Sequence, residues 1–529
     1  MGRTIELYDT TLRDGTQAEN FNLSVDDKIK VCRQLDRLGI DFIEGGWPGS
    51  NPLAVDFFKQ MQNVELKQAK LTAFGSTRHF HKKSEDDANL QALLAAGTPA
   101  VTIFGKSWDI HVIDALRIEL EDNLQLIEDS LAYLRPQVQH LLYDAEHFFD
   151  GFKNNREYCL ATLGRAIAGG AETIVLCDTN GGTLPHEIPE IMQRVAQYCT
   201  EQDRQVRIGI HAHNDSETGV ANALMGVNMG ATQVQGTVNG FGERCGNANL
   251  TSIIPALIFK MGLECKVGKR IDQLYTTARM VTELANLPHN RYQPYVGESA
   301  FAHKGGVHVS AVQRNPMTYE HIAPEKVGNM RRVLISDQSG KASVLMKAKR
   351  YGLDIDQDDP AIAAIISELK ILENQGYQYE AAEASFELLM RRAMGLQRDF
   401  FQLEAFWILH HNDTTKQPIT EAAIRLHVKD NEVHTASMGE GPVNALDRAL
   451  RKALTRFYPN LEEMELTDYK VRVLTGEHGT GAKVRVLVES RDLQDNWGTV
   501  GVSVNIIEAS WLALVDSINY KLMKDEKHH

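Results

Sequence analysis

Residues 206–215 read VRIGIHAHND, a short β-branched run that ends in two histidines and an aspartate. A run of this length and composition predicts a buried strand whose end carries polar side chains. Seven other runs of this kind occur in the first half of the chain, at 5–12, 41–46, 71–75, 100–105, 139–145, 173–178 and 232–238. Segments with the helical spacing of about 3.6 residues lie between them. They cover 25–38, 53–62, 86–96, 119–134, 156–168, 186–199 and 218–229.

This alternation of strands and helices predicts a parallel (β/α)₈ barrel, the TIM fold, over residues 1–270. A doubly wound open sheet is the competing interpretation, because periodicity alone does not show whether the sheet closes. Several of the helical segments end in glycine, which favours a left-handed residue at the C-terminal cap. These glycines are Gly39, Gly97, Gly169 and Gly230.

The strand rhythm stops near residue 270, and residues 271–400 are predicted to form a mainly helical linker region. A new alternation predicts a separate α+β domain over residues 401–529. Its expected strands are 404–410, 420–428, 468–474, 482–489 and 500–506, and its expected helices are 443–457 and 508–523. Glycines at 439–442 and 475–481 are expected to form loop turns of this domain.

The composition excludes several classes of protein. The 529 residues carry 56 basic and 70 acidic side chains, a net charge of −14 that disfavours nucleic acid and anionic membranes as partners. No apolar run approaches the ~20 residues that span a bilayer. The first residues lack the pattern of a signal peptide, and the six cysteines are scattered without a CxxC pair. We therefore expect a cytoplasmic protein with reduced cysteines.

A carboxylate and two histidines form the strongest candidate site. In a barrel, functional side chains lie at the C-terminal ends of the strands. His211 and His213 are two apart near the end of the seventh strand, so they share a face, and Asp14 follows the first strand. Two imidazoles and a carboxylate suit a divalent metal, and Asn247 is a candidate for a further oxygen ligand. The similar HFH at 79–81 lacks an acidic strand-end partner, so we expect it at the surface or in a supporting position.

Three further strand-end residues are candidates for chemistry. Arg13 carries a permanent charge that suits a carbonyl or carboxylate oxygen, although a salt bridge at the barrel rim is an equal interpretation. Glu146 and Thr179 follow the fifth and sixth strands, where loop capping is the alternative. The glycines of loop 239–247 miss the dinucleotide pattern by one residue and follow the eighth strand, which disfavours a nucleotide-binding fold.

Ordered motifs along the chain resemble the α-isopropylmalate synthase/homocitrate synthase family of barrel metalloenzymes. They are DTTLRDGTQ at 9–17, IEGGWPGSNP at 43–52, AEHFFDG at 145–151, CDTNGG at 177–182, HAHND at 211–215 and GFGERCGNANL at 240–250. The resemblance continues through AFAHKGGVH at 300–308 and MTYEHIAPEKVGN at 317–329. It extends into a C-terminal domain like the family's leucine-type regulatory domain, and so covers essentially the whole chain.

The resemblance implies a role for each matching residue. Asp14, His211 and His213 would bind the metal, with Asn247 as a further ligand. Arg13 would polarise the keto oxygen of a 2-oxo acid, and Thr179 would hold its carboxylate. Glu146 would position the acetyl thioester, His303 would take part in removing the methyl proton, and Tyr319 would assist. The resemblance leaves open whether His303 and Tyr319 act in their own subunit or in the partner of a homodimer.

The family members are acyltransferases that condense acetyl-CoA with a 2-oxo acid. Residues 501–522 and 43–52 resemble the subgroup that uses pyruvate in isoleucine biosynthesis, which implies isoleucine as the feedback effector. Isopropylmalate or homocitrate synthesis is the alternative within the family. A retro-aldol lyase and an amino-acid sensor with an inactive barrel are alternatives of other classes.

The sequence says less about which metal binds and which residues select the substrate. Hard oxygen ligands with two histidines fit Mg²⁺ or Mn²⁺, and Zn²⁺ is also chemically possible. Phe104 and Tyr143 lie near strand ends, where their bulk would favour the methyl group of pyruvate over a larger side chain. Ordinary barrel packing is an equal interpretation of both residues.

Overall fold

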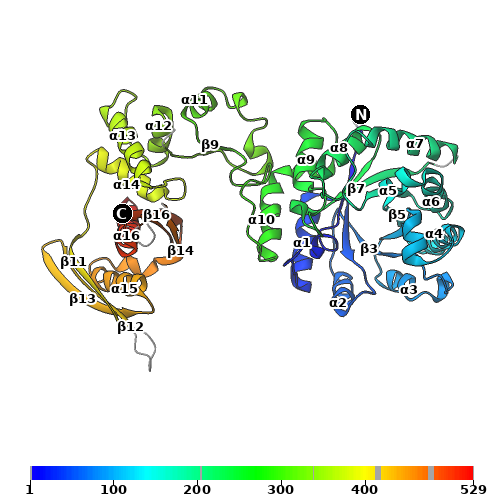
Figure 1. The fold of residues 1–529 in the computed structure, drawn as a ribbon, viewed down its shortest axis with the longest axis horizontal. Helices are drawn as coiled ribbons and strands as arrows, with labels where there is room; N and C mark the ends of the chain where they lie inside the picture. The colour runs from blue at the N-terminus through cyan, green and yellow to red at the C-terminus, as the bar shows by residue number, and fades with distance from the viewer. Residues whose placement is uncertain (1–2, 203–204, 337–338, 412–418, 475–481, 528–529) are drawn as a thin grey trace. The chain divides into compact units, whose positions relative to one another are not determined.

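The computed structural model describes residues 3–202, 205–336, 339–411, 419–474 and 482–527. The contacts divide the chain into two units (Figure 1). The first unit comprises Met1–Phe301 and Ile322–Met330, and the second comprises Ala302–His321 and Arg331–His529. Among the described residues, no helix is long and apolar enough to cross a membrane.

The first unit is built on a closed barrel of eight parallel strands in sequence order. Pairing of β1 with both β2 and β8 closes the sheet, which confirms the barrel and excludes the open sheet. The strands are β1 Glu6–Asp9, β2 Phe42–Gly46, β3 Lys70–Ser76, β4 Ala100–Lys106, β5 His140–Glu146, β6 Thr173–Asp178, β7 Arg207–Ala212 and β8 Gln233–Gly236. Each corresponds to a strand predicted from the sequence.

Helices surround these strands (Figure 1). They are α1 Val25–Leu38, α2 Pro52–Met61, α3 Ala88–Ala95, α4 Leu120–Leu134, α5 Phe148–Asn154, α6 Arg156–Ala168, α7 Ile188–Glu201, α8 Gly219–Asn228, α9 Leu250–Phe259 and α10 Leu274–Leu284. Inside the barrel Tyr8, Phe42, Ala100 and Leu142 form a small cluster, while the larger core lies between strands and helices. Helix α10 contacts α1 and adds Ala278 and Val281 to that larger core.

Two details differ from the predicted elements of the barrel. Strand β1 ends at Asp9 and not at Leu12, because the chain turns there and the N–H groups of Arg13 and Gly15 both bond to the carbonyl of Thr10. Gly39 caps α1 in the left-handed conformation as expected, with φ of 99°. Gly169 does not, since it continues the right-handed turn of α6 at φ of −68°, and Gly170 takes the left-handed position instead.

The second unit begins with short elements and helices. Strands β9 Ala302–His303 and β10 Arg332–Val333 pair in parallel. The helices are α11 Gly306–Arg314, α12 Lys341–Arg350, α13 Pro360–Gln375 and α14 Glu383–Ala393. The mainly helical character predicted for this region is confirmed. The predicted boundaries at 270 and 400 stay predictions.

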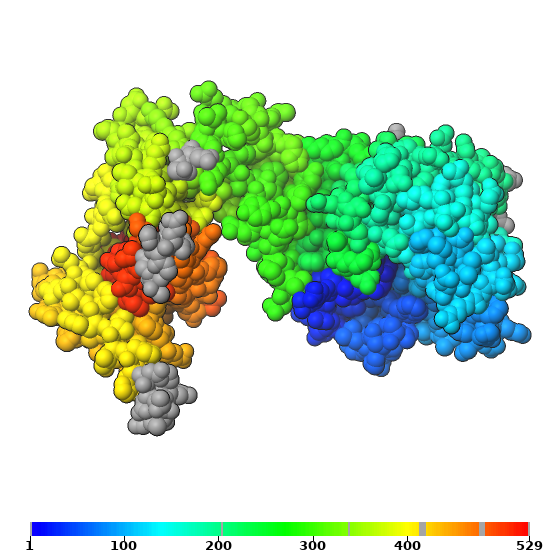
Figure 2. Space-filling model, in the orientation of Figure 1, coloured from blue at the N-terminus to red at the C-terminus, as the bar shows by residue number. Residues whose placement is uncertain are grey.

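Two three-stranded antiparallel sheets and two helices complete the second unit. The first sheet holds β11 Gln402–His411, β12 Ile419–Val428 and β13 Asn431–Gly439, with α15 Pro442–Leu454 against β12 and β13. The second holds β14 Glu465–Val473, β15 Val484–Arg491 and β16 Asn496–Ser503, and α16 Ile506–Lys527, drawn in red, lies against β15 and β16 (Figure 2).

Strand β13 was not among the predicted strands. Its sequence NEVHTASMG contains a single buried hydrophobic side chain, Val433, so no apolar alternation identifies it. It nevertheless pairs with β12 along its whole length. The expected turn at 475–481 lies outside the described residues.

Candidate active site

A cavity of about 240 Å³ opens where the barrel strands end. It lies on the side that TIM barrels use for catalysis. Of the residues that the sequence singled out, the cavity is lined by Arg13, Asp14, Phe104, Glu146, Thr179, His211 and His213. Residues that follow different strands therefore meet here, as the barrel prediction required.

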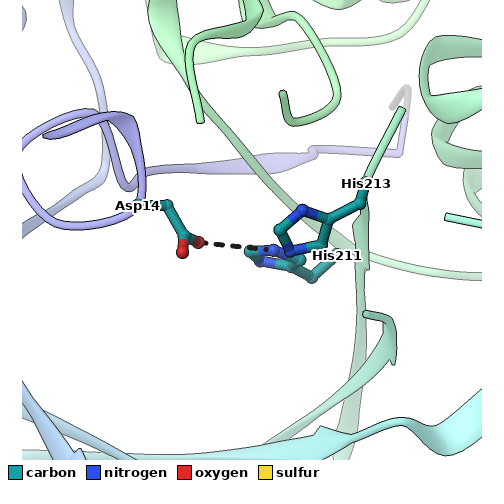
Figure 3. A group of neighbouring side chains, drawn as sticks. All are labelled: Asp14, His211 and His213. Atoms are coloured by element: carbon teal, nitrogen blue, oxygen red, sulfur yellow. Dashed lines mark ion pairs between the residues drawn. The ribbon is translucent and has the colours of Figure 1, made fainter. Parts of the chain in front are cut away.

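Asp14, His211 and His213 form a compact, buried cluster in this cavity (Figure 3). One ligand atom from each residue lies within 4.8 Å of the others. The Nε2 atom of His211 is 3.4 Å from Oδ2 of Asp14. Among the described residues, no other three His, Cys, Asp or Glu side chains meet in this way. His79 and His81 of the HFH motif are exposed.

The polar atoms around this cluster fit a divalent cation. Nδ1 of His213 and Oδ1 of Asn247 are buried and have no hydrogen-bond partner among the described residues. The backbone of Asn247 pairs with that of His213, so Asn247 is a direct neighbour of one residue of the cluster. Because leaving buried polar atoms unpaired is costly, these two atoms indicate that a ligand completes the site.

The charges of the cluster also suit a cation. Burial lowers the pKa of His213 to about 3, so this imidazole is neutral and one of its ring nitrogens offers a lone pair. Burial alone would raise the pKa of Asp14, but Arg13 and the two histidines hold it below its ordinary value. A neutral imidazole and an ionised carboxylate are the forms that bind metal ions.

Arg13 is held in place by two carboxylates and an aromatic ring. Its guanidinium forms ion pairs with Asp14 and with the fully buried Glu44, and its Cζ lies 3.8 Å from the centre of the Phe74 ring. Burial would lower the pKa of Arg13, yet Asp14 and Glu44 raise it above its ordinary value. The group is therefore a fixed positive charge in the cavity wall.

Glu146 and Thr179 face the cavity from neighbouring strands. Glu146 at the end of β5 pairs in register with Lys106 of β4, and their side chains form an ion pair of 2.5 Å. The hydroxyl oxygen of Thr179 accepts the backbone N–H of His147 at 2.9 Å. That contact uses the oxygen as acceptor, so the hydroxyl proton of Thr179 remains available for a bound anion.

Tyr143 does not line the cavity. Successive side chains of a strand point to opposite faces, and Asp144 and Glu146 of β5 point inward. Tyr143 between them points to the helix layer, where it is fully buried in the larger core. Phe104 does reach the cavity, where its ring stacks on Phe74 at 5.4 Å and meets Trp47 at 5.8 Å.

The loop after β8 is tightly folded. Gly246 has φ of 89°, and a Cβ added there would lie 2.0 Å from the carbonyl oxygen of Gly240. Arg244 donates two hydrogen bonds to the carboxylate of Asp215 and one to the carbonyl of Thr179. The glycines thus allow a compact turn that carries Asn247, and the arginine ties this turn to the loops after β6 and β7.

His303 and Tyr319 belong to the second unit, so the cavity geometry does not include them. Nε2 of His303 lies 3.1 Å from Oε1 of Glu320, a buried carboxylate that also binds the guanidinium of Arg331. Burial would raise the pKa of Glu320, but the hydrogen bonds from Arg331 and His303 lower it. Tyr319 is 48% exposed and its ring lies 4.2 Å from that of His308.

Three buried polar residues of the site were not predicted from the sequence. Glu44 in β2 binds Arg13, Tyr8 and Thr10. Asp144 in β5 and Gln235 in β8 are hydrogen-bonded to each other at 3.1 Å. Glu44 follows the apolar residues of β2 and Asp144 those of β5, and these interruptions were the available signal, whereas Gln235 lies in β8, where Gln233 is polar as well.

Comparison with known proteins identifies the family. The HMGL-like family model matches residues 4–281. The (R)-citramalate synthases of Aquifex aeolicus and Geobacter sulfurreducens are 54% and 55% identical to the chain, cover 100% and 99% of it, and are themselves covered to 99% and 98%. The chain belongs to the citramalate synthase branch of the isopropylmalate synthase/homocitrate synthase family.

Other matches agree with this branch of the family. The homocitrate synthase post-HMGL domain-like model matches residues 295–377, and the LeuA allosteric (dimerisation) domain matches residues 380–522. The 2-isopropylmalate synthase of Shouchella clausii covers the whole chain at 30% identity, with 98% of its own length matched. The lower identity disfavours the isopropylmalate alternative and confirms the resemblance to the pyruvate-using subgroup.

Proposed function

We propose that this protein is an acyltransferase that condenses the methyl carbon of acetyl-CoA with the keto carbon of pyruvate. Water then hydrolyses the thioester, and the products are citramalate and CoA. The full-length identity to citramalate synthases supports this function. The Asp14–His211–His213 cluster at the cavity is the structural observation that carries it.

The cluster is proposed to hold a divalent metal through Asp14, His211, His213 and the amide oxygen of Asn247. Mg²⁺ or Mn²⁺ fits this oxygen and nitrogen set best, and Zn²⁺ is chemically possible. When bound, such an ion acts as a Lewis acid that draws electrons from a carbonyl oxygen. Nδ1 of His213 and Oδ1 of Asn247, both buried without partners, are the atoms that support this assignment.

Arg13 and Thr179 are proposed to bind pyruvate. The guanidinium of Arg13 is fixed by Asp14 and Glu44, so it donates to the keto oxygen without a further entropic cost for ordering its side chain. As negative charge develops on that oxygen, the fixed positive charge stabilises it. The hydroxyl group of Thr179 donates a hydrogen bond to the carboxylate of pyruvate.

Glu146, His303 and Tyr319 are proposed to act on acetyl-CoA. The ion pair with Lys106 holds the Glu146 side chain at the cavity, where it orients the acetyl group. His303 takes a proton from the methyl group, directly or through water, and the resulting enolate carbon forms the bond to the keto carbon of pyruvate. The alkoxide formed on pyruvate then takes a proton from water, and His303 returns the methyl proton to solvent, so atoms and charge balance. The hydrogen bond to Glu320 keeps the His303 ring in one orientation.

An aromatic wall is proposed to select pyruvate. Trp47, Phe74 and Phe104 surround one side of the small cavity, with ring centres 5.4 to 6.5 Å apart. These rings accommodate a methyl group, whereas an isopropyl group requires the wall to move. Each added methylene shifts discrimination by ~1–3 kcal/mol, so modest changes in this wall are expected to alter specificity.

Regulation is proposed to reside in the second unit. The match of residues 380–522 to the LeuA allosteric (dimerisation) domain supports a homodimer and a small-molecule effector. Isoleucine is the proposed effector, because it is the end product of the pathway that the pyruvate-using subgroup serves.

The release of CoA thiol from acetyl-CoA, with Mg²⁺ or Mn²⁺, tests the substrate. We expect pyruvate to support the reaction, and kcat/KM for 2-oxoisovalerate and 2-oxoglutarate to be at least about tenfold lower. A preference for either larger acid would assign isopropylmalate or homocitrate synthesis instead. Wild-type protein that releases no thiol with any of the three acids would favour a sensor without catalytic activity.

A further inference from the structure

A chain of hydrogen bonds connects His211 to the interior of the barrel. Nδ1 of His211 on β7 lies 2.8 Å from Oε1 of Gln235 on β8. Nε2 of Gln235 in turn donates to Oδ1 of Asp144 on β5 at 3.1 Å. The three side chains are at most 4% exposed, so water does not compete for these bonds.

The direction of each hydrogen bond follows from the chemistry of the three groups. Oδ1 of Asp144 accepts from the NH₂ end of the Gln235 amide, and it keeps this acceptor role when the carboxyl group is ionised or carries its proton on Oδ2. The amide oxygen of Gln235 then faces His211, and because this oxygen only accepts, Nδ1 of His211 must carry the proton. The lone pair of the neutral imidazole is therefore on Nε2.

This tautomer has a consequence at the cluster. Nε2 of His211 faces Oδ2 of Asp14 across 3.4 Å. Both atoms then present lone pairs to each other, an arrangement that is stabilised by a cation between them. A reversed Gln235 amide would point its N–H group at Nδ1 of His211. Either two donors would then face each other, or the other tautomer would be favoured, in which the metal-facing Nε2 carries the proton.

We propose that Gln235 is a positioning residue that fixes His211 in the Nδ1-protonated tautomer, and that Asp144 fixes the orientation of the Gln235 amide. This role rests on the proposed function, in that the cluster is taken to bind a divalent cation. Gln235 is not among the residues that line the cavity, so it acts on the cluster through His211, whereas Asp144 does line the cavity. Groups that orient metal-binding histidines in this way commonly contribute 10- to 100-fold, roughly, to metal affinity.

Gln233 provides a matched control. It lies two residues before Gln235 on β8, is fully buried, and has neither amide atom hydrogen-bonded among the described residues. Replacing it by leucine removes a buried glutamine from the same strand and the same face without touching His211. Gln235→Leu removes the proposed hydrogen bonds, whereas Gln235→Glu retains an oxygen that accepts from Nδ1.

The test measures Mn²⁺ affinity by calorimetry on the full-length protein, with thermal melts to check folding. We expect Gln235→Leu to bind Mn²⁺ about 10- to 100-fold more weakly than wild type. Gln233→Leu is expected to match wild type, and Gln235→Glu to recover part of the lost affinity. Equal weakening in Gln233→Leu and Gln235→Leu, or none in Gln235→Leu, would overturn the proposal.

A second readout is made on the wild-type protein and does not depend on the folding of a Gln235 variant. In metal-free, ¹⁵N-histidine-labelled wild-type protein, the nitrogen shifts of His211, assigned with His211→Ala, should show the proton on Nδ1. An Nδ1 atom without a proton would refute the role of Gln235 even if Gln235→Leu failed to fold. Absence of Mn²⁺ binding to wild type would contradict the proposed metal site, while this tautomer measurement would still decide the role of Gln235.

Discussion

Asp9 and Asp14 stand five residues apart and ionise very differently. Asp9 is fully buried, and burial raises its pKa to about 7, although both of its oxygens accept hydrogen bonds from Thr11. Asp14 is almost as buried, yet Arg13 and two histidines hold its pKa below the ordinary value. The neighbouring charges, and not the residue type, decide which carboxyl group is available to a cation.

The raised pKa of Asp9 predicts a pH effect on stability. In the unfolded chain this group titrates near pH 3.9, roughly, so between there and about pH 7 the folded state holds a proton that the unfolded state has lost. Stability therefore falls as the pH rises through this window, by about 1.4 kcal/mol per pH unit at most. Asp9→Asn should show a smaller loss of Tm between pH 5 and pH 8, roughly, than wild type. Identical pH profiles for the two proteins would contradict the assignment.

At the residue scale, the sequence predicted some residues of the site and missed others. Asp14, His211 and His213 follow predictable strands, so their meeting could be expected from the barrel alone. The roles of Glu44, Asp144 and Gln235 were not identified, because each depends on a partner that is distant in the sequence. The orientation of Tyr143 depended on which face of β5 points inward, and the sequence did not settle that register.

Among the structural elements, the loop after β8 is the one whose backbone conformation most restricts which residues fit. Gly246 adopts φ of 89°, and the carbonyl of Gly240 occupies the space a side chain would need. Asn247 follows directly; its backbone pairs with that of His213, and its amide oxygen is buried without a hydrogen-bond partner among the described residues. Any shift in this turn therefore moves a proposed metal ligand.

Gly246→Ala is expected to disturb this turn. The added Cβ would lie 2.0 Å from the Gly240 oxygen, so the backbone must shift. A displacement of about 1 Å at a catalytic site can cost about 100-fold in rate. Gly182→Ala is the control, since no heavy atom lies within 4 Å of its added Cβ. The measurement is kcat for thiol release by the two variants. Equal values of kcat would show that the turn tolerates a Cβ at Gly246.

The elements themselves were largely predictable, for physical reasons that vary along the chain. Strand β6 contains the apolar run IVLC because both of its faces are buried, and every residue of this strand is buried. Strand β13 lacked that signal, since its pairing with β12 and not its own hydrophobicity stabilises it. Strand β1 was predicted too long because the β-branched threonines of DTTL favour a strand, whereas the chain turns at Thr10.

On the scale of the whole molecule, the chain combines a catalytic barrel with a unit of different architecture. The first unit contains the cavity and the metal-binding cluster. The second contains His303 and Tyr319, for which we propose catalytic roles, together with the two sheets of the proposed regulatory domain. The division explains why sequence motifs were needed for these two residues, since no strand-end rule applies outside the barrel.

Isoleucine is expected to lower the initial rate of thiol release, and leucine at the same concentration is not. An effector changes a distant site only if it binds the two states of the protein with different affinity. His211→Ala should therefore lose turnover while isoleucine still raises its Tm, because the proposed effector site lies in the second unit. Inhibition by leucine alone, or by neither amino acid, would refute isoleucine as the effector.

The formation of a carbon–carbon bond tests the central claim most directly. Acetyl-CoA labelled with ¹³C in its methyl group is incubated with pyruvate, Mn²⁺ and the protein, and the products are followed by NMR. We expect the label to appear in the methylene group of citramalate, and EDTA to prevent this. Label that remains in a methyl group, as acetate or unreacted acetyl-CoA, would contradict the proposed condensation.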